Sequence, residues 1–158
     1  GYPSMIPRYA LGNWWYKNDS YNMYDIDDML KKFKDNHIPI SIFLLGEKWH
    51  DNIKNYNYDK KLFDINALNE YYNNKKQKFG LTINPTLTIT PNDPLYNDVA
   101  QYINPIKEKI SLIPLNNNSI NAYLNLIVQN LMNTGINIFN IDYFNPKDKE
   151  NLFLPKQK

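Results

Sequence analysis

Aromatic rings, carboxylates and side-chain amides recur in this sequence at the ends of short apolar runs. Aromatic rings stack on the apolar face of a pyranose, and carboxylates and amides hydrogen-bond its hydroxyl groups. These residue types at strand ends therefore predict a carbohydrate site. Because 15% of the residues are aromatic, chance placement of some rings is the alternative. The residues singled out on this basis are Trp14, Glu47, Trp49, Asn84, Asp142 and Tyr143.

Asp142 is the main candidate for a catalytic group, because it directly follows the apolar run at residues 136–141. An ionisable residue at the end of a barrel strand is typical of a catalytic residue. Side-chain alternation puts Asn140 and Asp142 on one face of that run, and Phe139 and Ile141 on the other. We expect the apolar pair to face helices and the polar pair to face the site. The alternative is that Asp142 caps the turn that follows it.

No pattern in the sequence indicates a metal or a cofactor. The chain has no cysteine, and the spacing of its two histidines, His37 and His50, matches no common zinc site. No glycine-rich phosphate loop follows any apolar run. His50 and Asp51 are adjacent, so on an extended segment their side chains point apart and a catalytic pair is not expected. We therefore expect a site without metal or cofactor.

Charge and hydropathy exclude several classes of protein. The net charge is +2, from 18 basic and 16 acidic residues, which gives no electrostatic basis for binding nucleic acid or an anionic membrane. No stretch approaches the ~18 consecutive apolar residues of a membrane-spanning helix. Residues 1–4 carry neither the basic nor the apolar part of a signal peptide. These features predict a cytoplasmic protein with no nucleic-acid or membrane partner.

Apolar runs alternate with amphipathic stretches along the chain. The apolar runs predict strands at residues 10–15, 40–45, 81–83 and 136–141. Helical spacing of apolar residues predicts helices at residues 25–36, 66–78, 95–102 and 119–134. We expect Ser119 to cap the last helix, and Gly80 and Gly135 to end the second and the last.

Four strands that alternate with helices predict an α/β fold with a parallel sheet. The strands are apolar runs rather than alternating patterns, which predicts that both of their faces are covered. Two architectures agree with this reading. One is a small doubly wound domain, and the other is part of a (β/α)8 barrel, which normally needs ~250 residues.

Five segments, in order, resemble the first half of the catalytic barrel of glycoside hydrolase family 31. Residues 6–15 (IPRYALGNWW) are similar to the P-x-[WY]-A-L-G-x-W opening of that barrel, and residues 37–41 (HIPIS) to its I-P strand start. Residues 135–142 (GINIFNID) resemble the strand that ends in the nucleophilic aspartate. The other two matches are Lys48-Trp49-His50 with Phe63-Asp64, and the spacing of Pro85, Pro91, Tyr96 and Ala100.

The resemblance implies a partial (β/α)8 TIM barrel, with residues 1–158 as a single unit that holds about the first four parallel strands. The remainder of the barrel would come from the parent chain. It also implies retaining, α-glucosidase-like hydrolysis of α-linked sugars by two carboxylates ~5–5.5 Å apart. Asp142 would be the nucleophile. The acid/base residue would lie on a later strand, so this chain alone is expected to be inactive. Substrate-binding roles would fall to Trp14, Glu47, Trp49, Asn84, Asn140 and Tyr143.

Four places depart from the pattern of the family. Gly46 stands where a sugar-binding aspartate is expected, and Tyr16-Lys17 where Ser-Arg is expected after the first strand. Asn84 stands where a histidine is expected, and Asn140 where a tryptophan is expected. Loss of a charged hydrogen bond to a sugar hydroxyl costs ~1.5–3 kcal/mol. A second interpretation is therefore an inactive carbohydrate-binding or interaction module on the same scaffold. A third is an independent small α/β domain of unrelated function.

Overall fold

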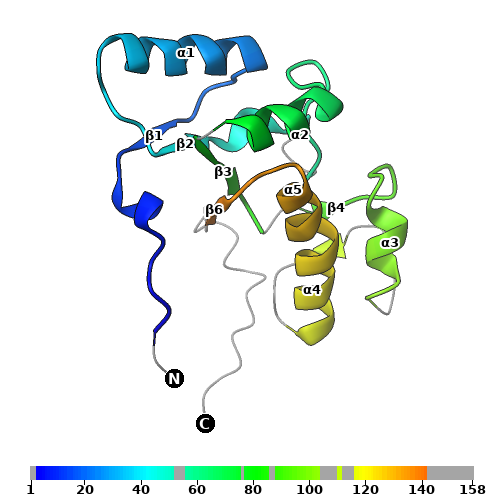
Figure 1. Ribbon diagram of the computed structural model, residues 1–158. Coiled ribbons are helices and arrows are strands. Elements are labelled where there is room, and N and C mark those ends of the chain that lie inside the picture. The colour runs from blue at the N-terminus through cyan, green and yellow to red at the C-terminus, as the bar shows by residue number, and fades with distance from the viewer. Residues whose placement is uncertain are drawn as a thin grey trace.

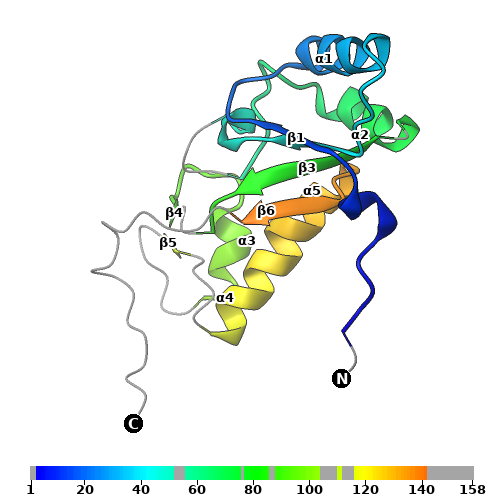
Figure 2. The ribbon, with the colours of Figure 1, turned by 90° about the vertical axis from the view of Figure 1, so that its left-hand side faces the viewer.

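The computed structural model describes residues 3–51, 56–75, 77–85, 88–103, 110–111 and 116–141. Its centre is a four-stranded sheet in the order β1-β2-β3-β6, in which every neighbouring pair is parallel. Figures 1 and 2 show these strands side by side, with the helices packed around them. The predicted parallel order is confirmed. The strands are β1 (Trp14–Lys17), β2 (Ile42–Leu45), β3 (Lys78–Ile83) and β6 (Ile138–Ile141).

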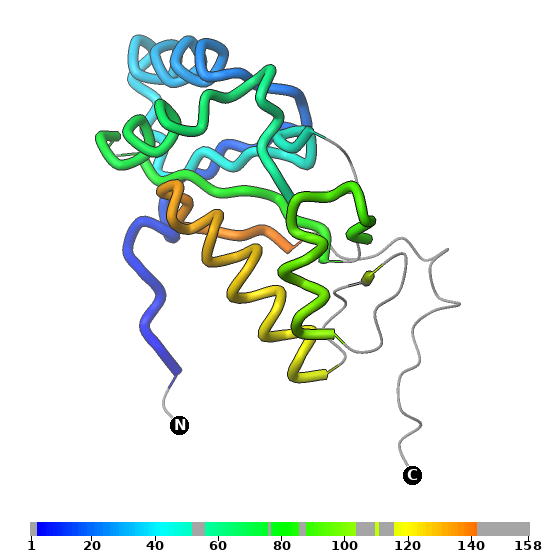
Figure 3. The backbone as a smooth tube through the Cα atoms, turned by 90° about the vertical axis from the view of Figure 1, so that its right-hand side faces the viewer, coloured from blue at the N-terminus to red at the C-terminus, as the bar shows by residue number. Residues whose placement is uncertain are grey.

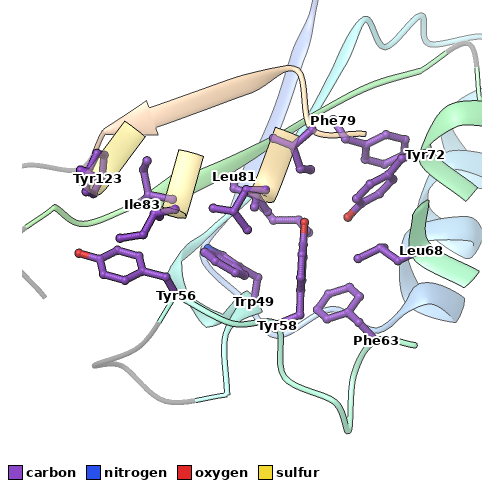
Figure 4. Packing of buried hydrophobic residues seen from close by; sticks show 14 of the residues in the cluster. Trp49, Tyr56, Tyr58, Phe63, Leu68, Tyr72, Phe79, Leu81, Ile83 and Tyr123 are labelled. Carbon is purple, nitrogen blue, oxygen red and sulfur yellow. The ribbon is translucent and has the colours of Figure 1, made fainter. Parts of the chain in front are cut away.

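One face of the sheet carries the main hydrophobic core. Phe43, Phe79 and Leu81 on this face pack with Ile26 of α1 (Met23–Asp35) and Leu68 of α2 (Ile65–Asn74). Figure 4 shows Leu68 and Tyr72 against Phe79, with Trp49 and Tyr58 beside Leu81. Burial of each large apolar side chain contributes ~1.5–3 kcal/mol, so these contacts hold the helices against the strands.

The opposite face of the sheet is covered at its centre and open at its edges. Ile42 and Leu44 are buried there, whereas Trp14 and Tyr16 on β1 are 46% and 45% exposed. Trp14 pairs with Ile42, and Tyr16 pairs with Leu44. Side chains alternate along a strand, so all four lie on the face opposite the core residues Phe43 and Leu45. The expectation that both faces are covered therefore holds for the central strands β2 and β3 and is wrong for the edge strands β1 and β6.

The predicted start of the first strand and the predicted end of the second helix are wrong. Strand β1 begins only at Trp14, because Arg8–Leu11 forms a 3-10 turn in which Ala10 N–H donates to the Pro7 carbonyl. Gly80 does not end a helix but lies inside β3, where a Cβ would come 2.8 Å from Leu44 and 3.2 Å from Ile138. The preceding helix α2 already ends at Asn74.

The last helical segment runs unbroken through three assigned parts. These are α4 (Asn117–Ala122), a π-helical stretch η3 (Tyr123–Val128) and α5 (Gln129–Asn133). The cap is Asn116 rather than Ser119, because the Asn116 side chain accepts from Ser119 N–H at 2.9 Å. Gly135 ends the segment at φ +96°, a left-handed conformation that favours glycine, as predicted. Figure 3 follows this segment as one continuous coil.

Two short elements complete the described structure. The helix predicted at residues 95–102 is present as α3 (Tyr96–Ala100). Strands β4 (Thr88–Ile89) and β5 (Ile110–Ser111) form a separate antiparallel pair that the sequence analysis did not predict. In the described ranges, no helix combines the length and the apolar character needed to cross a membrane.

Candidate active site at the carboxyl edge of the sheet

A cleft of about 310 Å³ lies at the carboxyl ends of the first three strands. Asn18 follows β1, Glu47 follows β2 and Asn84 follows β3, and all three side chains contribute to its wall. Ligands of parallel α/β folds bind at this edge of the sheet. The predictions that Glu47 and Asn84 come together there agree with this geometry. The full lining is Asn18, Ser20, Glu47, Lys48, His50, Asp51, Asp59, Leu62 and Asn84.

Asn18 and Gly46 determine how the floor of this cleft is built. The Asn18 side-chain oxygen accepts a hydrogen bond from Glu47 N–H at 3.0 Å. A Cβ on residue 46 would lie 2.5 Å from that oxygen and 2.6 Å from the Asn18 Cα. Space for any side chain at position 46 is therefore taken by Asn18. The expected aspartate is absent for a steric reason visible in this chain.

Trp49 supports the cleft from below and does not line it. Its side chain is 2% exposed, and its indole N–H donates to the Thr82 carbonyl of β3 at 2.8 Å. The indole also meets the Tyr58 ring edge-on at 5.0 Å, as seen in Figure 4. A buried ring of this kind cannot stack on a sugar in the cleft, so the structure contradicts the predicted sugar contact of Trp49.

The segment after Trp49 turns back on itself and brings further carboxylates to the cleft. Asp51 N–H donates to the Asn57 carbonyl, and Asp59 N–H donates to the Trp49 carbonyl. Tyr58 links this segment to the last helical segment. Its hydroxyl lies 2.9 Å from Thr134 Oγ1, and the Thr134 hydroxyl donates to the Leu131 carbonyl. Burial raises the pKa of the Tyr58 phenol, so the group stays protonated and donates to Thr134.

Asn84 is held in place through its backbone. Its carbonyl accepts a hydrogen bond from the Tyr56 hydroxyl at 2.9 Å. Tyr56 is buried and meets the ring of Tyr123, in the π-helical stretch, edge-on at 6.0 Å. Figure 4 shows these two tyrosines on either side of Ile83. The end of β3 is thus tied to the last helical segment.

Asn140 lies on the open face of β6, as predicted. Its amide donates to Thr82 Oγ1 at 3.3 Å, across the registered pair of β3 and β6. Phe139 packs against the core, as expected from alternation, but Ile141 is 58% exposed because it lies at the edge of the described sheet. The predicted site residues Asp142 and Tyr143 lie outside the described residues.

Trp14 does not reach the cleft. Because β1 starts at Trp14 rather than at residue 10, Trp14 is its first residue and lies at the opposite end of the strand from Asn18. Its indole N–H donates to the Ala10 carbonyl at 3.0 Å. The expectation that Trp14 lies at the carboxyl end of the first strand is therefore wrong.

The cleft is polar and predominantly acidic. Glu47, Asp51 and Asp59 contribute carboxylates, against the single ammonium of Lys48. Asn18, Ser20 and Asp59 were missed by the sequence analysis. Asn18 directly follows β1, which ends at Lys17. The sequence would have indicated Asn18 if the end of this strand had been predicted correctly. In the described ranges, no group of three or more histidine, cysteine or acidic side chains could hold a metal.

A comparison with known protein families identifies the family of this chain. The model of the glycosyl hydrolases family 31 TIM-barrel domain matches residues 3–156, which is nearly the whole chain. A comparison with curated proteins gives no match. The match spans all four strands of the parallel sheet and the cleft at their carboxyl ends.

Proposed function

Because this chain belongs to family 31 of the glycosyl hydrolases, as part of the TIM-barrel domain, we propose that it serves a retaining hydrolysis of α-linked sugars, with Asp142 as nucleophile. The membership establishes a glycoside hydrolase domain. The observation that carries the finer proposal is the register of β3 and β6. Ile83 pairs with Ile141, and in the sequence these two strand ends are followed by Asn84, which lines the cleft, and by Asp142.

In the proposed reaction the Asp142 carboxylate attacks the anomeric carbon and the bond to the leaving oxygen breaks. A second carboxylic acid gives its proton to that oxygen, which leaves a covalent glycosyl ester on Asp142. Water then attacks the anomeric carbon, gives its proton to the second carboxylate, and releases the sugar and Asp142. Net retention follows from two successive inversions. An α-glucoside is the substrate we propose to test first.

The described residues support binding of hydroxyl groups in the cleft. The carboxylate of Glu47 and the amide of Asn84 can accept from, or donate to, neighbouring sugar hydroxyls. We keep both as substrate-binding residues. Asn140 has its amide engaged with Thr82, so we propose that it contacts the sugar through its side-chain oxygen. Tyr143 remains a prediction for the substrate site, whereas Trp14 lies at the other end of β1 and is not kept as a sugar contact.

We propose that residues 1–158 supply one half of the barrel and that the rest, including the acid/base residue, comes from further strands. The exposure of the two edge strands supports this. Trp14 and Tyr16 on β1 and Ile141 on β6 leave large apolar surfaces in solvent, and an unpaired strand edge readily pairs with another strand. Closure of a barrel would cover both edges.

A second candidate function is a carbohydrate-binding module without catalysis. It is favoured by Gly46, because Asn18 excludes any carboxylate at a position where the family pattern has one. Such a module would bind sugar in the cleft without cleaving the glycosidic bond.

The test uses the full-length parent protein and an aryl α-glucoside. We expect Asp142→Ala to abolish turnover and azide to restore part of it, with a glycosyl azide of inverted configuration as product. Asn140→Ala, which changes the same strand without removing the nucleophile, is the matched control and should retain far more activity. Near-normal turnover by the Asp142→Ala protein would refute the nucleophile assignment. Sugar binding without any turnover by the wild-type protein would support the binding module.

A further inference from the structure

A second concave surface lies far from the cleft, at the amino-terminal side of the sheet. It is a groove of about 670 Å³ between α1, the turn that leads from α1 into β2, and the end of α2. Figures 1 and 2 show α1 and α2 side by side at this end of the molecule. We call it the basic groove, defined by Asp27, Leu30, Lys31, Phe33, Lys34, His37, Ile38, Pro39, Ile40, Lys75 and Gln77.

The charge of the basic groove is one-sided. Asp27 is its only acidic lining residue, and it is already engaged by Lys75 at 2.9 Å and by the Tyr71 hydroxyl at 3.0 Å. Among the ion pairs of the described residues, none involves Lys31 or Lys34. Two ammonium groups of the groove lining therefore form no ion pair within the described part of the chain.

Apolar side chains form the floor between these cations. Leu30 and Phe33 come from α1, and Ile38, which is 47% exposed, comes from the following turn. An exposed apolar surface inside a charged rim is the usual character of a peptide-docking groove. A simple inorganic anion would gain nothing from the apolar floor, and a membrane surface needs apolar side chains that protrude rather than line a hollow.

The backbone of His37 gives an independent indication of function. The residue adopts φ +57°, a left-handed conformation, and closes α1 in a Schellman motif. His37 N–H donates to the Lys34 carbonyl, and Ile38 N–H donates to the Phe33 carbonyl. Glycine is strongly preferred at this position because a side chain there is strained. A histidine kept in a strained conformation beside unpaired lysines points to a role for its imidazole in the groove.

From these observations we infer that the basic groove docks an acidic segment of a partner protein, in which two or more carboxylates flank apolar side chains. The carboxylates would pair with Lys31, Lys34 and the imidazole of His37. The apolar side chains would cover Phe33 and Ile38. The inference is independent of catalysis, because the basic groove shares no residue with the cleft.

The test measures binding of the full chain to a fluorescein-labelled peptide with alternating glutamates and one leucine and one phenylalanine, by fluorescence anisotropy at low salt. We expect saturable binding that Lys31→Ala/Lys34→Ala weakens about fivefold or more. The control is Lys60→Ala/Lys61→Ala, which removes the same charge from two exposed lysines outside the groove. We expect it to change the affinity for the peptide less than about twofold, because salt screens charges that lie far from the bound peptide. Peptides with glutamine for glutamate, or alanine for leucine and phenylalanine, should bind more weakly.

His37→Gly separates docking from folding. We expect this variant to unfold at a higher urea concentration than wild type, since glycine relieves the strain, and yet to bind the acidic peptide more weakly. The proposal is overturned if binding is not saturable up to about 1 mM peptide. It is also overturned if both lysine pairs matter equally, if His37→Gly binds unchanged, or if inorganic phosphate or phosphatidylserine vesicles bind as tightly as the peptide.

Discussion

The side chain of Asn18 accepts a hydrogen bond from Glu47 N–H at 3.0 Å and at the same time occupies the space beside Gly46. This contact joins the ends of β1 and β2, and it orients the residue that brings a carboxylate to the cleft. The Asn18 amide, which follows the neighbouring strand, thus takes the space that a side chain on residue 46 would need.

Gly46→Ala is expected to lower the free energy of unfolding by ~1–3 kcal/mol, because the new Cβ would lie well inside contact distance of Asn18. Urea denaturation measures the loss. Asn18→Gly/Gly46→Ala removes the clash with the side chain but keeps the close approach to the Asn18 Cα, so it should recover only part of the stability. Wild-type stability in Gly46→Ala would show that Asn18 moves aside freely.

Trp49→Phe should destabilise the protein by ~1–3 kcal/mol, since the Thr82 carbonyl would lose its buried donor while the aromatic packing is largely kept. Trp14→Phe is the matched control. Its indole N–H also bonds a carbonyl, but at an exposed position, so we expect a change within ~0.5 kcal/mol. Equal effects of the two substitutions in urea denaturation would contradict the supporting role of Trp49.

Asp93 should make stability fall as the pH rises. The residue is 8% exposed, its Oδ2 has no hydrogen-bond partner among the described residues, and burial raises the pKa of its carboxyl group above the ordinary value of 3.8. The folded state therefore holds this proton more tightly than the unfolded state. From pH 3.8 upward, until the raised pKa is passed, the unfolded state is progressively favoured.

Asp93→Asn removes this titration while an amide oxygen still accepts from Leu95 N–H. We expect the stability of the variant relative to wild type to increase from acidic to neutral pH, whatever the offset at acidic pH. Urea denaturation at a series of pH values measures this difference. A difference that does not change with pH would mean that Asp93 is not held in its neutral form by burial.

The 158-residue chain alone is expected not to hydrolyse aryl α-glucosides, because the proposed acid/base carboxylate is contributed by further strands. Release of the aryl group measures turnover. Turnover that is lost in Asp142→Asn would show that a second carboxylate lies within these residues. Glu47, on the wall of the cleft, would then be the first to replace, with Asp98 of α3, which does not line the cleft, as the control.

The sequence by itself determined the order of the four parallel strands and the helices between them, but not the antiparallel pair β4 and β5. Apolar runs that alternate with amphipathic helices predict neighbouring parallel strands. The helix between two strands returns the chain to the end of the sheet where the previous strand began, so the next strand runs in the same direction. The family resemblance was likewise readable from short segments such as residues 6–15 and 135–142, and the family match over residues 3–156 confirms it. The end of the last helix at Gly135 was also readable, since a left-handed residue there favours glycine.

Only the tertiary structure decided which of the candidate side chains reach the cleft. Trp49 is turned inward by a hydrogen bond to Thr82, and Gly46 is constrained by Asn18 from another strand. Asp59 lies at the cleft because its backbone N–H donates a hydrogen bond to the Trp49 carbonyl. The spacing of apolar residues in the sequence indicates only which side chains of one helix or strand face the core. The direction of a side chain at a strand end depends on partners tens of residues away, and no local pattern encodes them.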